Sequence, residues 1–139
     1  MSGKFFLDTN VFVYSFDARH PSKQKTAQGL IDKALSSHGG LVSYQVVQEF
    51  LNVALKKFEK PLTLPEARAY LDAVLEPLCR TLPAIQLYQR ALELKGETGF
   101  GFYDCLVLAS ALETGCRVLY TEDLHHQRRV GGLTIQNPF

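Results

Sequence analysis

Apolar residues follow two alternating patterns along the chain. Short segments that are typical of strands lie at residues 5–7, 41–42, 79–82, 117–120 and 133–135, and the first two are continuously apolar. Between these segments, apolar positions recur every three or four residues, which predicts a helical turn or two at 11–14 and helices beginning near Pro21, Ser43, Thr63, Pro83 and Tyr103. Strands that alternate with helices favour a mainly parallel sheet covered on both faces. We therefore expect one α/β domain with three α/β/α layers over residues 1–139.

Proline and glycine mark where these helices should stop. Pro61 and Gly115 are each expected to end a helix. Thr63 is followed three residues later by a Glu, which is capping-box spacing. The helix that begins there should run to about Leu75 and end before Pro77, because proline interrupts helical hydrogen bonding.

The composition describes an ordinary globular chain without a strong net charge. Of the 139 residues, 46% are hydrophobic and 21% are charged, and the formal net charge is +1. Such a chain exerts no long-range attraction on a polyanion. A nucleic-acid partner would therefore need local basic clusters or bound cations on this protein.

The cysteines and the length of the apolar runs bear on the compartment. Cys79, Cys105 and Cys116 are odd in number and form no CxxC pair, which argues against a disulfide framework and a zinc site. Free thiols are typical of a reducing cytosol. Asp8 interrupts the apolar N-terminus, and no run approaches the ~20 apolar residues of a membrane span. We expect a cytoplasmic protein with no membrane partner.

Two acidic positions directly follow predicted strands. Asp8 comes after the first strand, and Thr121-Glu122-Asp123 comes after the strand that ends at Tyr120. In open parallel sheets, ligands bind beyond the carboxyl ends of the strands, where loops and helix starts converge. Acidic groups from both segments are therefore expected at the same edge of the sheet.

Two further acids are placed by helical spacing. Glu49 shares a helix flank with Val46 and Val53, which should face the sheet. Asp104 opens an otherwise apolar helix and lies three residues before Val107, on the same stripe. Both acids are expected to point inward or along the seam between helix and sheet.

Each of these four acids has an ordinary structural role open to it. Asp8, Asp104 and Asp123 stand where helices can start, and Asp is favoured at N-caps, while Glu49 could face solvent or join a salt bridge. Four acids at one edge are more than capping needs, and burial and repulsion would raise their pKa values unless cations lie between them. Oxygen ligands without a matching Arg or Lys suit Mg²⁺ or Mn²⁺. The hypothesis is a one- or two-metal phosphodiesterase site.

Five segments, in order, resemble one known family. They read FLDTNVFVY, SYQVVQEFLNVAL, YDCLVLASALETGC, VLYTEDL and GLTIQNPF, and they span nearly the whole chain. They resemble PIN-domain ribonucleases, specifically the VapC-like toxin branch of bacterial toxin–antitoxin pairs. The resemblance implies a PIN-like fold and a catalytic, metal-holding quartet of Asp8, Glu49, Asp104 and Asp123.

The same resemblance implies an activity and partners. It implies Mg²⁺-dependent (or Mn²⁺-dependent) endonucleolytic cleavage of RNA that leaves a 5′-phosphate, a homodimer, and inhibition by a small cognate antitoxin protein. Thr9, Asn10 and Thr121 would support the acids as polar neighbours. The family's pattern of Thr or Ser, any residue, then Asp favours Asp123 over Glu122 as the ligand.

Basic and aromatic side chains near the acids are candidates for RNA contacts. Arg128 and Arg129 could reach flanking phosphates, although a solvated loop explains them equally well. Phe102 and Tyr103 could stack on unpaired bases, and packing at the helix entry is the structural alternative. Related toxins often have a glycine soon after the TEDL-like motif, whereas residues 125–130 contain none, which leaves the shape of this loop open.

Other functions compete with a toxin ribonuclease. A haloacid-dehalogenase-like phosphatase also places a nucleophilic Asp after its first strand, but Asn10 stands where its second Asp would be. A housekeeping RNA-processing or DNA-cleaving nuclease would share the metal chemistry. A catalytically inactive, RNA-binding or regulatory PIN domain would keep the fold alone.

Overall fold

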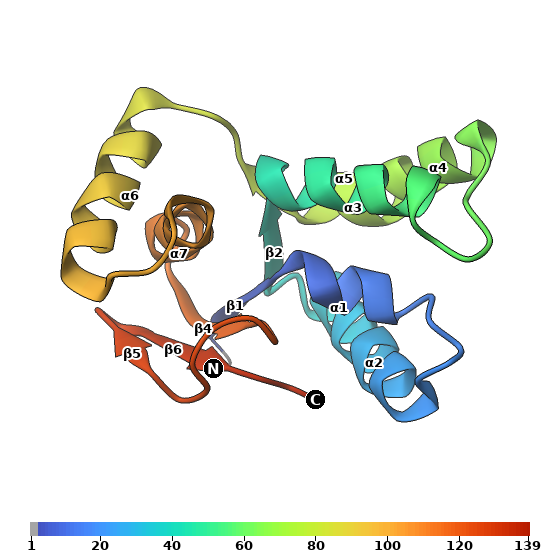
Figure 1. Ribbon diagram of the computed structural model, residues 1–139, viewed down its shortest axis with the longest axis horizontal. Helices are drawn as coiled ribbons and strands as arrows, with labels where there is room; N and C mark the ends of the chain where they lie inside the picture. The colour runs from blue at the N-terminus through green and yellow to red at the C-terminus, as the bar shows by residue number, and fades with distance from the viewer. Residues whose placement is uncertain (1–2) are drawn as a thin grey trace.

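A six-stranded sheet forms the centre of the protein, which the computed structural model describes over residues 3–139 (Figure 1). Every neighbouring pair of strands is parallel except the pair at one edge, and the order is β3-β2-β1-β4-β6-β5. The mainly parallel sheet that the sequence predicts is confirmed. The strands are β1 (Lys4–Leu7), β2 (Gly40–Ser43), β3 (Cys79–Thr81), β4 (Cys116–Tyr120), β5 (Arg129–Val130) and β6 (Leu133–Gln136).

Helices lie on both sides of this sheet. They are α1 (Thr9–Tyr14), α2 (Pro21–Ser37), α3 (Tyr44–Lys56), α4 (Leu64–Tyr70), η1 (Leu71–Leu75), α5 (Glu76–Leu78), α6 (Ile85–Thr98) and α7 (Phe102–Glu113). Figure 1 shows α6 and α7 on one side of the strands and α1 and α2 on the other. The predicted three-layer α/β/α arrangement is thereby confirmed. Along residues 3–139, no helix combines the length and the apolar character that crossing a bilayer requires.

The helix that follows Thr63 extends further than predicted. The expected capping box is present: the Thr63 N–H donates to the Glu66 carboxylate at 2.9 Å, and the Glu66 N–H donates back to the Thr63 hydroxyl at 3.2 Å. The chain does not leave the helix before Pro77, because a π turn at 71–75 leads directly into α5. Pro77 lies in the first turn of α5, a position that tolerates its missing N–H.

The predicted strand at 133–135 is confirmed as β6, but the short β5 that pairs with it in a C-terminal hairpin was not predicted from the sequence. Residues 125–130 contain no glycine, yet Gln127 adopts a φ of 67°, in the left-handed region that favours glycine. The Gln127 N–H donates to the Ile135 carbonyl at 2.6 Å, which holds the loop against β6. One non-glycine residue in a left-handed conformation thus makes the turn in this loop.

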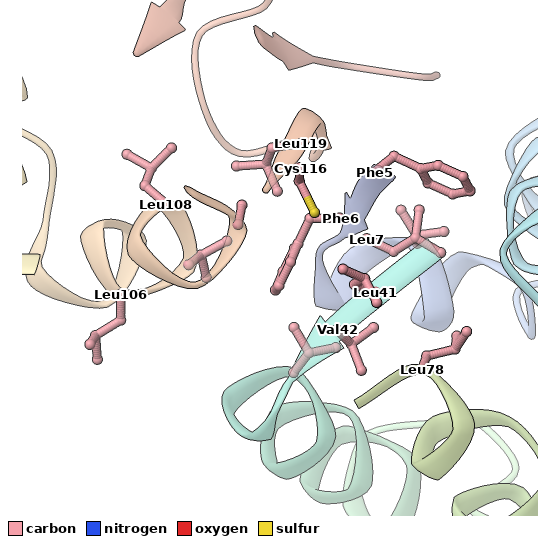
Figure 2. Close-up of a cluster of buried hydrophobic side chains, with 14 of the residues drawn as sticks. Phe5, Phe6, Leu7, Leu41, Val42, Leu78, Leu106, Leu108, Cys116 and Leu119 are labelled. Atoms are coloured by element: carbon pink, nitrogen blue, oxygen red, sulfur yellow. The ribbon is translucent and has the colours of Figure 1, made fainter. Parts of the chain in front are cut away.

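The hydrophobic core surrounds β1 and extends along α7 (Figure 2). Phe6 and Leu7 in β1 and Leu108 in α7 are fully buried. All seven residues of 105–111 are buried, so α7 is enclosed along most of its length. Since β1 and α7 are fixed by packing, the residues that leave their ends are held in defined positions at the edge of the sheet.

Candidate active site

The carboxyl ends of β1 and β4 bring two acidic segments together. The strands are neighbours in the sheet, and their register sets Leu7 opposite Tyr120. The next residue, Asp8, donates its backbone N–H to the Tyr120 carbonyl at 3.0 Å. Asp8 and the segment 121–123 therefore leave the sheet at the same edge, as the topology predicts.

Asp8 is the buried member of the site. The residue is 7% exposed, and its carboxylate accepts from the Thr9 N–H at 2.7 Å and from the Thr121 hydroxyl at 2.8 Å. The capping role and the clustering role therefore coexist, because Asp8 is the N-cap of α1. Burial raises the pKa of Asp8 to about 6, and the charges of Glu49 and Asp123 act in the same direction.

Glu49 reaches the site from the middle of α3. It accepts from the Thr9 hydroxyl at 3.2 Å and from the Gln45 amide at 2.8 Å. Its side chain is exposed rather than turned toward the sheet as the helical spacing suggested, so the two hydrogen bonds, not packing, set its orientation.

Gln45 is a site residue that the sequence analysis did not single out. It is 7% exposed, and besides Glu49 its amide donates to the Tyr103 carbonyl at 3.3 Å. Gln45 thus links the helix that carries Glu49 to the helix that carries Asp104. The available signal was its position four residues before Glu49 on the same helix face, where side chains are neighbours.

Asp123 lies beside the polar residues that follow β1. The Asn10 amide donates to the Asp123 carboxylate at 3.2 Å and to the Thr121 hydroxyl at 3.4 Å. The Thr121 hydroxyl also accepts from the Asp123 N–H at 3.1 Å while donating to Asp8. The three residues predicted as supports therefore each contact an acid of the cluster: Thr9 contacts Glu49, Asn10 contacts Asp123 and Thr121 contacts Asp8.

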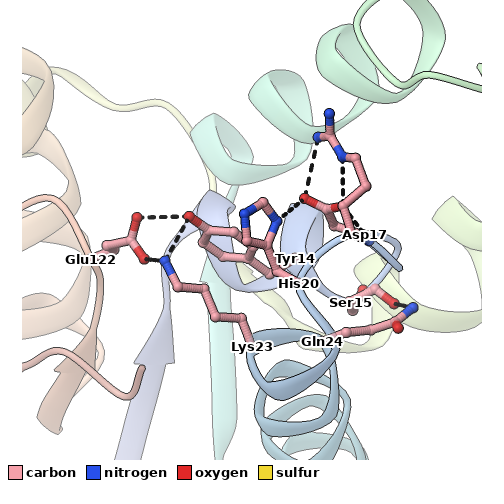
Figure 3. Close-up of polar contacts among 8 residues, drawn as sticks. Tyr14, Ser15, Asp17, His20, Lys23, Gln24 and Glu122 are labelled. Atoms are coloured by element: carbon pink, nitrogen blue, oxygen red, sulfur yellow. Dashed lines mark hydrogen bonds and ion pairs between the residues drawn. The ribbon is translucent and has the colours of Figure 1, made fainter.

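Glu122 faces a different group of residues from its neighbour Asp123. Its carboxylate accepts from the Tyr14 hydroxyl at 2.8 Å and from the Lys23 ammonium at 2.9 Å (Figure 3). The ion pair with Lys23 offsets the charge of Glu122, and the two contacts together occupy both carboxylate oxygens. The arrangement agrees with the choice of Asp123 as the acid that faces the cluster.

Asp104 completes the cluster from the first turn of α7. It is half-buried, and its pKa is raised by burial and then by the charges of Asp123 and Glu49. The charges of Glu49 and Asp123 therefore act on both Asp8 and Asp104. Among residues 3–139, the ion pairs formed by Lys, Arg and His involve none of these four acids, so the negative charge of the cluster has no protein cation against it.

The atoms at this edge that could bind a metal fit a hard divalent cation. All of them are oxygens, and the Asn10 Oδ1 and Gln45 Oε1 atoms are buried without a hydrogen-bond partner among the described residues. In the same part of the chain, no group of three or more His, Cys, Asp or Glu side chains is arranged so that it could hold a metal ion by itself. Mg²⁺ keeps several waters and is usually held by one or two carboxylates, so an open acidic site suits it.

The four candidate RNA-contacting residues lie in two separate places. Tyr103 is 71% exposed beside Asp104, and the half-buried Phe102 packs against it with ring centres 5.7 Å apart. The Arg128 guanidinium stacks over the Phe100 ring at 4.7 Å, close in the chain to the start of α7. Arg129 is exposed in β5, at the far edge of the sheet.

A cleft of about 720 Å³ lies away from the acids. It is lined by residues from the end of α1, the following loop and the C-terminal part of α3, among them Phe16, Arg19, Val53 and Phe58. None of the four acids lines it. The cleft and the acidic cluster are separate features of the molecule.

Comparisons with known proteins bear on the family and the fold of the chain. The family model described as PIN domain matches residues 5–133. No curated protein matches the chain.

Several solved structures share the fold at low sequence identity. A toxin–antitoxin complex from Klebsiella pneumoniae aligns with a TM-score of 0.67 and 19% identity, covering 99% of this chain and 98% of the other. A DNA-bound VapBC from Salmonella typhimurium gives 0.64 and 19%, covering 99% and 100%. VapC20 of Mycobacterium tuberculosis, described as a sarcin–ricin loop cleaving toxin, gives 0.59 and 21%, covering 86% and 90%.

Proposed function

The chain belongs to the PIN domain family, and on this premise we propose that it is a divalent-metal-dependent endoribonuclease acting as the toxin of a toxin–antitoxin pair. The observation that carries the proposal is the acidic cluster. Asp8 and Asp104 have raised pKa values because burial and neighbouring carboxylates oppose their ionisation. A fold that keeps these charges together without a protein cation is arranged for a cation from outside.

The residues divide into ligands and supports. Asp8, Glu49, Asp104 and Asp123 would hold Mg²⁺ or Mn²⁺ through their carboxylates. When bound, such a cation offsets phosphate charge and makes an attacking water more acidic. Thr9 orients Glu49 and Thr121 orients Asp8, while the Asn10 amide orients Asp123.

RNA can be the substrate only if a bound cation offsets the negative charge of the acidic cluster. The acidic cluster by itself repels a phosphate backbone, and the net charge of +1 does not offset this. Tyr103 presents an exposed ring next to Asp104, a suitable surface for an unpaired base. Arg128 and Arg129 would contact flanking phosphates, and Phe102 would hold the Tyr103 ring in place.

The toxin role and the partners extend the proposal beyond the site. Structural neighbours include a toxin–antitoxin complex and a VapBC complex bound to DNA, which supports a small cognate antitoxin as the partner of this chain. We further propose a homodimer in the cytoplasm.

Cleavage of RNA by the purified protein tests the proposed function. Total RNA is incubated with wild type in Mg²⁺, in Mn²⁺ and in EDTA, with Asp104→Asn and the exposed helix variant Asp32→Asn alongside. We expect discrete cuts that require metal, persist in Asp32→Asn and disappear in Asp104→Asn. A folded wild type that leaves RNA intact in both metals would contradict the nuclease and favour an RNA-binding PIN domain.

A further inference from the structure

A polar cluster outside the acidic site is attached to the loop that carries Asp123. The Tyr14 hydroxyl donates to one Glu122 oxygen at 2.8 Å, and the Lys23 ammonium donates to the other at 2.9 Å (Figure 3). Lys23 also donates to the Tyr14 hydroxyl at 3.2 Å, which closes a triangle. We call Tyr14, Lys23 and Glu122 the Glu122 anchor.

The C-terminal segment packs against the Glu122 anchor. The Phe139 ring lies 4.9 Å from the Tyr14 ring in an edge-to-face arrangement. The Lys23 ammonium lies 4.7 Å from the Tyr14 ring centre and 5.9 Å from that of Phe139. The anchor therefore joins α1, α2, the loop after β4 and the C-terminal segment.

The loop after β4 sends consecutive side chains to different partners. Thr121 contacts Asp8, Glu122 enters the anchor, and Asp123 faces Asn10. Asp123 is exposed, and its carboxylate accepts one side-chain hydrogen bond among the described residues, at 3.2 Å. Packing does not fix the Asp123 carboxylate, so its position depends on the backbone of the loop.

We propose that the Glu122 anchor is a positioning device that holds the loop so that Asp123 meets the metal. This inference rests on the proposed function, since it takes Asp123 as a metal ligand. Tyr14 and Lys23 would act through Glu122 and would touch neither metal nor RNA. Outer hydrogen bonds of this kind commonly set metal affinity by orienting a ligand.

Charge alone predicts a different result from positioning. Lys23 is a cation near an acidic site, so removing its charge should by electrostatics strengthen the binding of a divalent cation. If Lys23 holds the loop, removing it should weaken binding. Tyr14→Phe changes no charge and keeps the ring against Phe139, so any effect reports the lost hydroxyl and its hydrogen bonds with Glu122 and Lys23.

Titration of the metal-free protein with Mn²⁺ by calorimetry tests the proposal. We expect binding to weaken about tenfold in Lys23→Met and about threefold in Tyr14→Phe. Arg68→Met is the matched control, because it removes an exposed ion pair of 3.0 Å with Asp72 that lies away from the site. Unchanged or tighter binding in both anchor variants would overturn the inference while leaving the proposed function intact.

Hydrogen exchange supplies a second readout that needs no metal. In the metal-free protein, amides of residues 121–124 should exchange faster in Lys23→Met and Tyr14→Phe than in wild type and Arg68→Met. Equal exchange in all four proteins would show that the anchor does not hold the loop. A wild type that binds no Mn²⁺ would instead overturn the proposed function, and with it the metal role of the anchor.

Discussion

The first turn of α7 and the buried stretch that follows it differ in whether their polar side chains have partners. Along the buried stretch 105–111, the chain satisfies its own groups: the Ser110 hydroxyl is buried and donates to the Leu106 carbonyl at 2.9 Å. One residue before this stretch, Asp104 faces other carboxylates, and its pKa is raised. The buried Ser110 finds its hydrogen-bond partner within the helix, whereas Asp104 in the first turn lies in a cluster of carboxylates without a protein cation.

The difference between these regions concerns what each contributes to stability. Burial of apolar side chains along α7 stabilises the fold, by roughly 1.5–3 kcal/mol for each fully buried large side chain. Acids that repel one another oppose folding at neutral pH, and the core must offset this cost. Substitutions in the two regions should therefore have opposite effects on stability and on activity.

The largest expected effect is on activity, at Asp8. Asp8→Asn should lower metal-dependent RNA cleavage about a thousandfold, because it removes a charged ligand from the site. In the metal-free protein at pH 7, the same change should raise the free energy of unfolding by about 3 kcal/mol, because it removes a buried charge. Cleavage assays and urea denaturation measure the two effects. A variant that loses both activity and stability would contradict the comparison.

The core is expected to behave in the opposite way. Leu108→Ala should lower the free energy of unfolding by about 3 kcal/mol, since Leu108 is fully buried and its truncation leaves a cavity. The variant should keep its Mn²⁺ affinity wherever it remains folded. Leu92→Ala is the control at a side chain that is 60% exposed, with an expected change within about 0.5 kcal/mol. Urea denaturation at 25 °C compares them.

The pH dependence of the free energy of unfolding tests the raised pKa of Asp8. The pKa of Asp8 rises to about 6 in the folded protein from 3.8, so between these values the folded state binds more protons than the unfolded state. The stability that protonated Asp8 contributes is fully present below about pH 4 and is lost as pH rises through about 6. The free energy of unfolding should fall by about 3 kcal/mol over this range. The difference in unfolding free energy between wild type and Asp8→Asn, measured without metal from pH 4 to 7, isolates it. A difference that does not change with pH would contradict the raised pKa.

The smallest expected effect is at Gln45, which joins the helix that carries Glu49 to the first turn of α7. Gln45→Ala removes the hydrogen bond to Glu49 at 2.8 Å and the link to the Tyr103 carbonyl, so Mn²⁺ binding should weaken about tenfold. Gln48→Ala is the matched control, because Gln48 is exposed on the same helix. Calorimetry on both variants would count against this role if their Mn²⁺ affinities were equal.

Much of the fold could be predicted because its signals are local. The buried strand at 5–7 and the apolar stripe of α7 are visible as runs and spacings in the sequence. The capping box at Thr63 was also correct, since a cap depends on residues a few positions apart. The π turn before Pro77 and the hairpin at Arg129 were missed, because both depend on tertiary packing that overrides local preference.

The meeting of acidic segments at one edge of the sheet was predictable, and the hydrogen bonds that connect them were not. Asp8 and Asp123 could be placed together because strands end at a common edge of a parallel sheet. Glu49 was assigned to the correct helix, but its side chain is exposed and is held by hydrogen bonds to Thr9 and Gln45. These contacts join residues whose meeting depends on how two helices cross.

The sequence by itself determined the order of strands and helices and the positions at which carboxylates leave the sheet, because periodicity and strand ends are properties of neighbouring residues. Only the tertiary structure decided that Glu122 turns to Lys23 while Asp123 turns to Asn10, since adjacent residues with the same charge differ only in what surrounds them. It also decided that Gln45 links two acid-bearing helices. Long-range contacts of this kind arise from packing, which no local pattern encodes.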